Sequence, residues 1–325
     1  MPARAPEPQP DPVRDLRIQG STTLAELMAQ FGRTGGFTAA KLAMAAQITE
    51  RMLRDRDCLR ILSFPAAIIS TGTRGVVRDM VAQGAVDAII TTCGTLDHDL
   101  ARVWRDYYIG TFEMDDAELR HRGVHRLGSV LVPETSYGLI LEEKLRPILE
   151  QLHKQKQRWG PRELCRELGL ALASEPERDA SILWHAAQRG VPVFVPGITD
   201  GAVGSQLWLF TQRHRDFTVD VLRDEQDLSD LVHTKPKLGA LMLGGGISKH
   251  HTIWWAQFRD GLDYAVYITT AQESDGSLSG ARTREAISWG KLKEHGAHVT
   301  VEGDVTVLLP LLWGAVAGAG PGAGR

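Results

Sequence analysis

The chain of 325 residues contains few cysteines, few lysines and few aromatic residues. The three cysteines, Cys58, Cys93 and Cys165, are odd in number, lie far apart and lack metal-ligand spacing. They exclude a disulfide framework and indicate a reducing compartment, which we expect to be the cytoplasm. We also expect no metal site, because the adjacent histidines 250 and 251 point apart on a helix and have no third ligand at suitable spacing.

An excess of charge of either sign is also missing, since the formal net charge is -3. No basic cluster with interleaved aromatic residues occurs, so nucleic acid is not an expected partner. The apolar run that starts at Val305 is interrupted by Pro310 and is shorter than the roughly 20 residues that cross a bilayer, so we expect no membrane span. Residues 1–16 are proline-rich without the apolar core of a signal peptide, and we predict a disordered tail there and a flexible tail over 319–325.

Short apolar runs alternate with amphipathic patterns along the rest of the chain. Each run ends in a turn rich in glycine or threonine, and the six runs cover residues 58–64, 85–92, 191–197, 238–246, 262–270 and 297–301. Strands that are apolar throughout and alternate with helices are typical of a mostly parallel sheet covered on both faces. The sequence therefore predicts an α/β fold in one large domain over 17–318, with a helical insertion over 136–190.

The turns after these strands are the expected ligand site. In a parallel sheet the ligand lies outside the carboxyl ends of the strands, where backbone N–H groups and helix N-termini attract phosphate. This placement favours a nucleotide or dinucleotide ligand. No G-x-G-x-x-G or G-x-x-x-x-G-K-[ST] is present, and "GGG" at 244–246 alone is a weak signal because glycine is common in turns.

Lysine is unusual here because only nine of the 37 basic residues are lysine. Lys291 follows Trp-Gly in "EAISWGKLKEHGA", residues 285–297, which we interpret as a helix with Lys291 on its apolar face, four residues after Ile287. A lysine on a drier face loses hydration of its ammonium form and becomes available as an amine nucleophile that forms an imine. The alternative is a lysine whose stem lies on apolar surface while its amine reaches water. Lys249 in "GGGISKHH" is a second candidate.

Other polar residues collect at the same turns. A histidine could act as a base, and acidic residues beside a tryptophan could hold a cationic amine through charge pairing and cation–π contact. Asp200 in "ITDG" is equally well explained as a turn or helix-cap residue. The set as a whole predicts a site for a polyamine-type substrate.

Three segments, "LMLGGGISKHH", "DYAVYITTAQESDGSLSGARTREAISWGK" and "VPVFVPGITDGAVG", closely resemble deoxyhypusine synthase. The similarity covers nearly all of the chain after about residue 16, and the "GGGxxKHH" and "SWGK" motifs in this order are highly specific. The resemblance implies a Rossmann-like fold that binds NAD, and a homotetramer with sites at subunit interfaces. It also implies transfer of an aminobutyl group from spermidine through an imine on an enzyme lysine.

The resemblance also assigns roles to individual residues. Lys291 would be the nucleophile of "SWGK", and His250 would contact the polyamine and act as a base. The other substrate contacts would be Asp97, His98, Ser205, Gly276, Ser277, Leu278, Glu285 and Trp289. NAD would be held by Ser70, Thr92, Cys93, Gly94, Asp200, Gly245, Thr270, Ala271, Asp304 and Val305.

Three positions depart from the family pattern, because His98, Ser205 and Leu278 stand where the family carries acidic residues. Removal of a carboxylate that pairs with a desolvated ammonium group typically costs a few kcal/mol. The sequence thus predicts a transferase with an altered polyamine clamp. A homospermidine synthase-like enzyme with a small diamine acceptor, and a non-catalytic NAD-binding subunit that regulates a paralogue, stay open. The high arginine and alanine content predicts a bacterial source.

Overall fold

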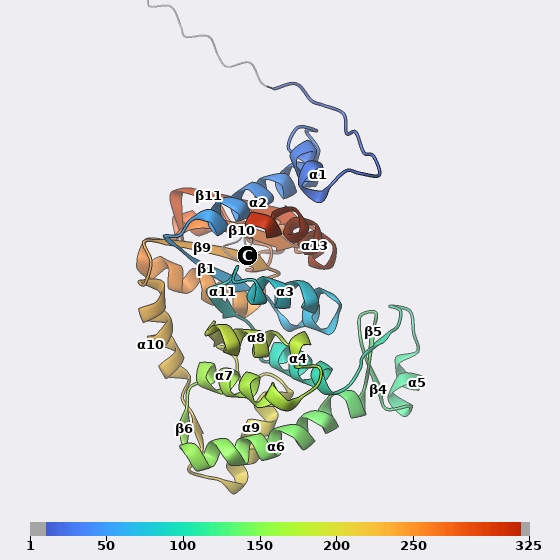
Figure 1. Ribbon diagram of the computed structural model, residues 1–325, viewed down its shortest axis with the longest axis vertical. Coiled ribbons are helices and arrows are strands. Elements are labelled where there is room, and N and C mark those ends of the chain that lie inside the picture. The colour runs from blue at the N-terminus through green and yellow to red at the C-terminus, as the bar shows by residue number, and fades with distance from the viewer. Residues whose placement is uncertain (1–10, 320–325) are drawn as a thin grey trace, which may run out of the picture.

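The computed structural model describes residues 11–319, which form a central parallel sheet with helices on both faces (Figure 1). The predicted disordered tail is described only over 11–16, which are exposed and carry no helix or strand, and all but residue 319 of the predicted flexible C-terminal tail lie outside the described residues. No helix in the described range is long and apolar enough to cross a membrane.

All six predicted strands occur, and they form the central sheet. They are β1 (Cys58–Ser63), β2 (Ala88–Ile90), β7 (Val193–Phe194), β9 (Lys237–Leu243), β10 (Leu262–Thr269) and β11 (Leu292–Glu302). Every neighbouring pair is parallel, in the order β11-β10-β9-β1-β2-β7. Counted along the chain this is 3-2-1-4-5-6, the doubly wound Rossmann order. The predicted α/β fold with a mostly parallel sheet is confirmed.

Successive residues of the central strands pack against opposite layers of helices. Leu62 and Leu241 belong to the core cluster that contains the buried residues of α2 (Phe37–Arg54), α3 (Thr73–Ala82) and α13 (Val305–Val316). Ile61 and Met242 belong to the cluster with α10 (Val221–Val232) and α11 (Gly246–Ala256). This alternation follows from the pleat, and it explains why the strands are apolar at every position.

The remaining helices pack beside the sheet. Three of them, α6 (Gly138–Gln155), α7 (Pro161–Ala171) and α8 (Ile182–Arg189), match the three predicted helical patterns of residues 136–190. They pack with α4 (Cys93–Trp104) and α9 (Ala202–Arg213), while α1 (Leu24–Phe31) packs on α2 and α13. A two-stranded sheet pairs β6 (Arg158–Trp159), which follows α6, with β8 (Thr218–Val219), which follows α9.

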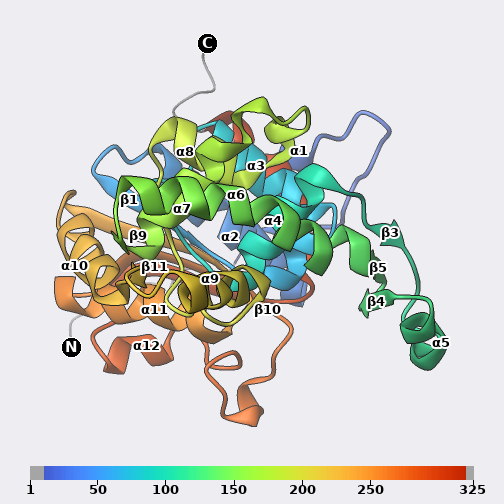
Figure 2. The same ribbon diagram turned by 90° about the horizontal axis from the view of Figure 1, so that it is seen from below.

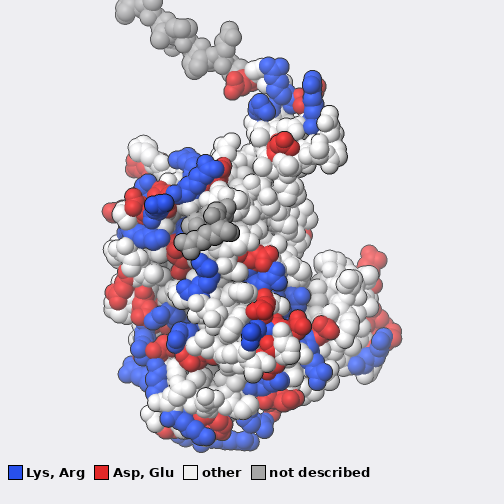
Figure 3. Space-filling model, in the orientation of Figure 1, with Lys and Arg blue, Asp and Glu red and all other residues white. Residues whose placement is uncertain are grey.

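A small antiparallel sheet projects from the body, as Figures 1 and 2 both show. It consists of β3 (Tyr108–Ile109), β5 (Val130–Pro133) and β4 (Val124–Leu127), with α5 (Asp116–His121) before β4. The alternation of long apolar runs did not predict this sheet, because its strands are only two to four residues long. On the face drawn in Figure 3, acidic and basic side chains are mixed without one sign dominating.

Candidate active site

The segment that carries Lys291 is a turn and not the predicted helix. Helix α12 (Glu285–Ser288) has a single turn, and the chain enters β11 at Leu292. The sequence interpretation of residues 285–297 as one helix was therefore wrong. Gly290 adopts φ +66°, in the left-handed region that favours glycine, so it ends the helix where an ordinary residue would be strained.

Hydrogen bonds fix the backbone of Lys291 on both sides. Its N–H donates to the carbonyl of Ala286 (2.9 Å), while the N–H of Gly290 donates to the carbonyl of Ile287 (3.0 Å). This pair of bonds with a left-handed glycine is a Schellman motif. The carbonyl of Lys291 accepts from the N–H of Leu262 at the start of β10 (3.1 Å). The lysine is thus positioned by a helix end and by the central sheet together.

The Lys291 side chain borders a cavity of about 380 Å³ on the α10 and α11 side of the sheet. The lining is largely apolar, and Met242 and Ala265 of the central strands form part of it. Five predicted site residues also line the cavity, namely His250, Leu278, Glu285, Trp289 and Lys291. Their meeting in one cavity, from α11, the segment before α12, α12 itself and the turn after it, makes this the candidate active site.

The amine of Lys291 lies in an aromatic environment. The residue is only 7% exposed, and Nζ lies 5.1 Å from the ring centroid of Trp289 and 5.4 Å from that of Trp254. Within residues 11–319, no carboxylate lies within 4.0 Å of this Nζ. Both rings present their faces to the amine, which favours a cation there. The two rings thus hold the amine of Lys291 in place without an ion pair.

His250 lies on α11 and shares the cavity with Lys291. Partial burial and the nearby positive charge of Lys291 lower the pKa of the imidazole. The ring is therefore neutral at pH 7 and can accept a proton. It packs against Trp254, one helical turn further on, with ring centroids 5.6 Å apart. The adjacent His251 points away, toward Glu225 of α10 (3.3 Å).

Lys249 forms one wall of the cavity and is itself buried. Its Nζ donates to the carbonyls of Leu278 (2.7 Å) and Ala281 (2.6 Å) and lies 3.8 Å from the ring centroid of Tyr267. Burial lowers the pKa of Lys249 to about 8. With two carbonyl acceptors and a ring face, the side chain acts as a fixed cation that holds the neighbouring segment, and not as a free amine.

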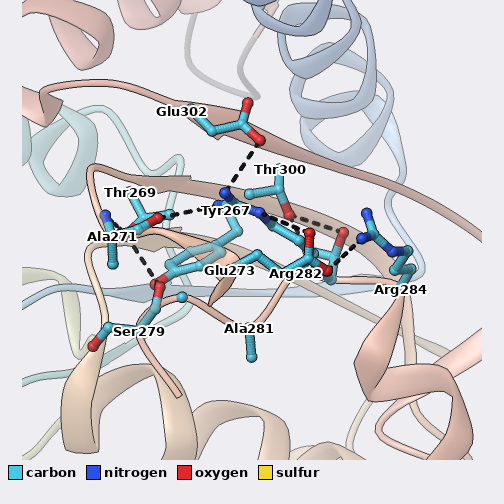
Figure 4. A network of polar contacts seen from close by, with 12 residues as sticks. Tyr267, Thr269, Ala271, Glu273, Ser279, Ala281, Arg282, Arg284, Thr300 and Glu302 are labelled. Atoms are coloured by element: carbon cyan, nitrogen blue, oxygen red, sulfur yellow. Dashed lines mark hydrogen bonds and ion pairs between the residues drawn. The ribbon is translucent and has the colours of Figure 1, made fainter. Parts of the chain in front are cut away.

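The segment between β10 and α12, residues 270–284, connects the cavity to the edge of the sheet (Figure 4). Tyr267 donates through Oη to the carbonyl of Ser279 (2.6 Å). Arg282 pairs with Glu302 of β11 (3.5 Å) and approaches Glu273 (3.9 Å), which also contacts Arg284. These bonds tie Ser279 and Arg282 to the central strands, and the same stretch, residues 278–283, forms part of the cavity wall.

The predicted cofactor residues all follow carboxyl ends of the central strands. They come after β1, β2, β7, β9, β10 and β11 in turn, and they are Ser70, Thr92, Cys93, Gly94, Asp200, Gly245, Thr270, Ala271, Asp304 and Val305. The chain leaves β1 and β9, the two central strands, in opposite directions, so a topological switch point lies between them. This edge is therefore where ligands of doubly wound sheets bind.

Close packing supports part of this edge. Thr92 accepts a hydrogen bond through Oγ1 from the N–H of Ala66 (3.1 Å), and a Cβ at Gly94 would lie 2.8 Å from Cβ of Ala66. Glycine is therefore needed at 94 for α4 to approach the turn after β1. Cys93 is fully buried, and burial raises the pKa of its thiol to about 12, so it is an inert core residue. Val305 is likewise buried at the start of α13.

A second cavity, of about 800 Å³, opens at this edge. Ser70 and Asp304 border it together with Arg102, Tyr107 and residues of the projecting sheet. Asp304 is exposed, and its carboxylate caps α13 by accepting from the N–H of Thr306 (2.9 Å). Hydroxyl, carboxylate and guanidinium groups around a cavity of this size fit a dinucleotide.

The other predicted substrate residues do not border the Lys291 cavity in the single chain. Asp97 is fully buried in α4, where its carboxylate accepts from the N–H groups of Ala202 (2.8 Å) and Val203 (2.7 Å) and from Oη of Tyr137 (2.8 Å). It caps α9, and burial raises its pKa. Ser205, exposed on α9, donates to the carbonyl of Gly201 (3.0 Å).

His98 lies beside Asp97, with Nδ1 3.0 Å from Oη of Tyr107. Burial, and to a smaller extent Arg102, lowers the pKa of His98 to about 4, so the ring is neutral at pH 7. Gly276 and Ser277 lie in the exposed turn of residues 273–277, outside the cavity lining. The eight predicted substrate residues thus fall into separate groups on one chain.

Trp254 was missed by the sequence interpretation, although it lines the cavity and contacts both His250 and Lys291. Its spacing of four residues from His250 on a helix was the available signal. Arg282 was missed as well, because its role depends on Glu302, a residue distant in sequence. Among the described residues, no group of three or more His, Cys, Asp or Glu side chains could hold a metal ion.

Comparison with known proteins identifies the relatives of the chain. The sequence model of the family "DS: Deoxyhypusine synthase" matches residues 26–316. A protein of Picrophilus torridus named "Probable deoxyhypusine synthase" is 55% identical over 302 residues, 93% of this chain and 96% of the relative. A protein of the same name from Thermoplasma volcanium is 56% identical over 301 residues, with the same coverage. Both relatives are archaeal, and the bacterial source stays a prediction.

A crystal structure shares the fold. It is of a deoxyhypusine synthase homologue from Entamoeba histolytica, with a TM-score of 0.64 and 20% sequence identity over 94% of this chain and 96% of that chain. At this identity the likeness shows the fold alone.

Proposed function

Because the chain belongs to the deoxyhypusine synthase family, we propose that it is an NAD-dependent transferase that moves an aminobutyl-type group from a polyamine to an acceptor amine through an imine on Lys291. The observation that carries the proposal is the setting of Lys291. Its amine is buried, free of an ion pair among the described residues, and shares a cavity with the neutral imidazole of His250. A nucleophile and a base in one largely apolar cavity are what imine chemistry needs.

The residues at the carboxyl edge fit the proposed cofactor. Ser70 and Asp304 border the larger cavity, and Gly245 lies at the switch point, where the turn after β9 faces the turn after β1. When bound there, NAD would supply the reversible oxidation of the carbon next to the donor nitrogen. Residues 270–284, which run from this edge to the Lys291 cavity, would bring that carbon within reach of the amine.

In the next step Nζ of Lys291 replaces the donor nitrogen on the imine carbon. Its neutral Nζ attacks the carbon of the protonated donor imine, a new C–N bond forms, and the bond to the donor nitrogen breaks. The alkyl group is left as a protonated imine on Lys291, and the remainder of the donor leaves as an amine. His250 accepts a proton from Nζ during the attack and returns it to the leaving nitrogen, so charge and protons balance. Trp289 and Glu285 would hold the cationic end of the donor.

We further propose a cytoplasmic homotetramer with sites at its subunit interfaces. Asp97, His98 and Ser205 do not border the Lys291 cavity of their own chain, so they would reach a polyamine only from a neighbouring subunit. Of the three positions without the family acids, only Leu278 lines the cavity directly. The donor would therefore meet fewer carboxylates than in the family pattern, and a small diamine is as suitable an acceptor as a protein lysine.

Covalent trapping tests this function. The protein is incubated with spermidine and NAD, reduced with borohydride and digested, and the peptide that contains Lys291 is examined by mass spectrometry. We expect an alkyl adduct on Lys291 that Lys291→Arg loses, because arginine stays protonated and forms no imine. Lys293→Arg is the matched control, since Lys293 pairs with Asp263 (2.7 Å) outside the cavity.

Two results would contradict the proposal. Unchanged transfer by Lys291→Arg would remove the lysine from the mechanism. Calorimetric NAD binding by wild type without an adduct from spermidine, putrescine or other diamines would favour the non-catalytic NAD-binding subunit.

A further inference from the structure

Trp254 stands at the mouth of the Lys291 cavity. Lys291 is 7% exposed, whereas Trp254 is 42% exposed and Trp289 is 66% exposed. All three border the same cavity, and the amine lies near the faces of both rings. The two tryptophans are therefore exposed wall residues beside a buried amine, and a molecule that reaches the amine lies next to their rings.

Trp254 is held more firmly than its exposure suggests. It lies one helical turn after His250 on α11, packs against that imidazole, and meets the ring of Phe258 edge to face with centroids 6.1 Å apart. A large ring with only two side-chain torsions and two aromatic neighbours is a stiff wall. Trp289, by contrast, lies directly before the turn at Gly290.

We propose that Trp254 is a specificity-determining residue that admits unbranched alkyl groups to Lys291 and excludes groups branched at the carbon next to the reacting one. The inference rests on the proposed imine chemistry and adds to it the residue that selects the carbon skeleton. When Nζ becomes part of a protonated imine, the attached carbons must occupy the space next to the rings of Trp254 and Trp289. A chain of CH₂ groups can lie flat against an aromatic ring, whereas a methyl branch next to the reacting carbon collides with the ring.

An aldehyde probe tests Trp254 without cofactor or polyamine. The neutral amine, an aldehyde and a proton give the protonated imine and water, and cyanoborohydride then delivers hydride to give a stable secondary amine. Labelling of Lys291 by butanal and by 2-methylpropanal is followed by mass spectrometry of its peptide. The rate ratio of the two aldehydes is divided by the same ratio for free Nα-acetyl-lysine, which removes their intrinsic difference in reactivity.

Wild type should favour butanal by about tenfold or more beyond acetyl-lysine, because a methyl branch that does not fit a close-fitting pocket costs about as much as one misfitting methylene. Trp254→Ala should bring the corrected ratio to within about threefold of unity, and Trp254→Leu should lie between, since leucine is bulky but not flat. The matched control is Trp255→Phe. Trp255 is the next residue on α11, but its Nε1 donates to Glu225 (3.0 Å) and it does not line the cavity. This control should keep the wild-type ratio.

Three outcomes would overturn the inference. The first is a wild-type rate ratio equal to that of acetyl-lysine, and the second is a wild-type ratio that persists in both Trp254 variants. The third is a loss of selectivity in Trp255→Phe as large as in the Trp254 variants, which would indicate general loosening of α11. If Trp254→Ala does not fold, Trp254→Leu alone decides. Failure of polyamine transfer with a normal aldehyde ratio would contradict the proposed function and leave the role of Trp254 intact, so the two failures are distinguishable.

Discussion

His98 should make the fold sensitive to acid. Burial lowers the pKa of its imidazole to about 4, whereas an exposed histidine titrates near 6.5. Between these values the unfolded chain binds a proton that the folded chain does not, so stability falls as the pH drops through the window and is fully present above about 6.5. A difference of about 2.5 units at about 1.4 kcal/mol each gives roughly 3 kcal/mol.

The contacts of His98 explain why protonation is unfavourable. Its Nδ1 meets Oη of Tyr107 (3.0 Å), and the ring lies 5.5 Å from the ring of Tyr137. Arg102 adds a positive charge nearby and pairs with no carboxylate within 4.0 Å in the described range; it donates instead to the carbonyls of Ile69 and Thr71, both at 2.7 Å. The adjacent Asp97 is occupied by its capping bonds to α9.

Urea unfolding of wild type and His98→Gln at pH values from 7.5 to 4.0 measures the effect. Glutamine keeps a polar group near Tyr107 but does not titrate. Wild type should lose about 3 kcal/mol relative to His98→Gln across this range, because other acid-sensitive groups are common to both proteins. The exposed His125 of β4 provides the control His125→Gln, which should follow wild type. A difference between wild type and His98→Gln that stays constant with pH would refute the reasoning.

Two further substitutions test the buried charges of the site. Lys249→Met removes an amine whose folded-state pKa, about 8, lies below its unfolded value. As the pH rises from 8 to 10, wild type should therefore gain stability relative to the variant, by at most about 1.4 kcal/mol per pH unit. If urea unfolding shows the same pH dependence for wild type and variant, this prediction is contradicted. Asp97→Asn leaves the N–H groups of Ala202 and Val203 facing a weaker acceptor, and should lower the free energy of unfolding by roughly 2 kcal/mol. Unchanged thermal stability would argue against the cap.

The central sheet was predictable because each of its strands has a signal within its own short stretch of sequence. A fully buried strand shows an unbroken apolar run, and the turn after it is marked by glycine or threonine, so each of the six strands could be recognised separately. The individual cofactor residues did not follow from this signal; the family resemblance implies them, and they lie within these runs or up to six residues after them. The strands of the projecting sheet are too short to show any period.

The Lys291 cavity was less predictable, because its walls come from distant parts of the sequence. Residues of α11 and the turn after α12 meet only when β9, β10 and β11 have paired, which is why Trp254 and Arg282 were not recognised as site residues. Asp97 is a further case of a role that depends on distant residues. Its carboxylate caps α9, more than 100 residues further along the chain, and no local pattern could show this cap; its contact with substrate stays a prediction.

Gly290→Ala separates the sequence interpretation from the structure most directly. If residues 285–297 formed a helix, alanine would replace the poorest ordinary helix former and stabilise the protein by about 1 kcal/mol. In the structure Gly290 has φ +66°, and a Cβ there would meet no atom within 4 Å, so the effect is purely one of backbone strain. Alanine should then cost about 1–2 kcal/mol in the left-handed conformation.

The substitution should also disturb the site, because relief of the strain shifts the N–H of Lys291 away from the carbonyl of Ala286 (2.9 Å). We expect slower aldehyde labelling of Lys291 together with a lower midpoint of thermal unfolding. Gly72→Ala is the matched control. Gly72 precedes α3 with φ -62°, and a Cβ there also meets nothing within 4 Å, so it should stay within about 1 kcal/mol of wild type. A Gly290→Ala protein more stable than wild type would show that the helix, and not the Schellman turn, positions the lysine.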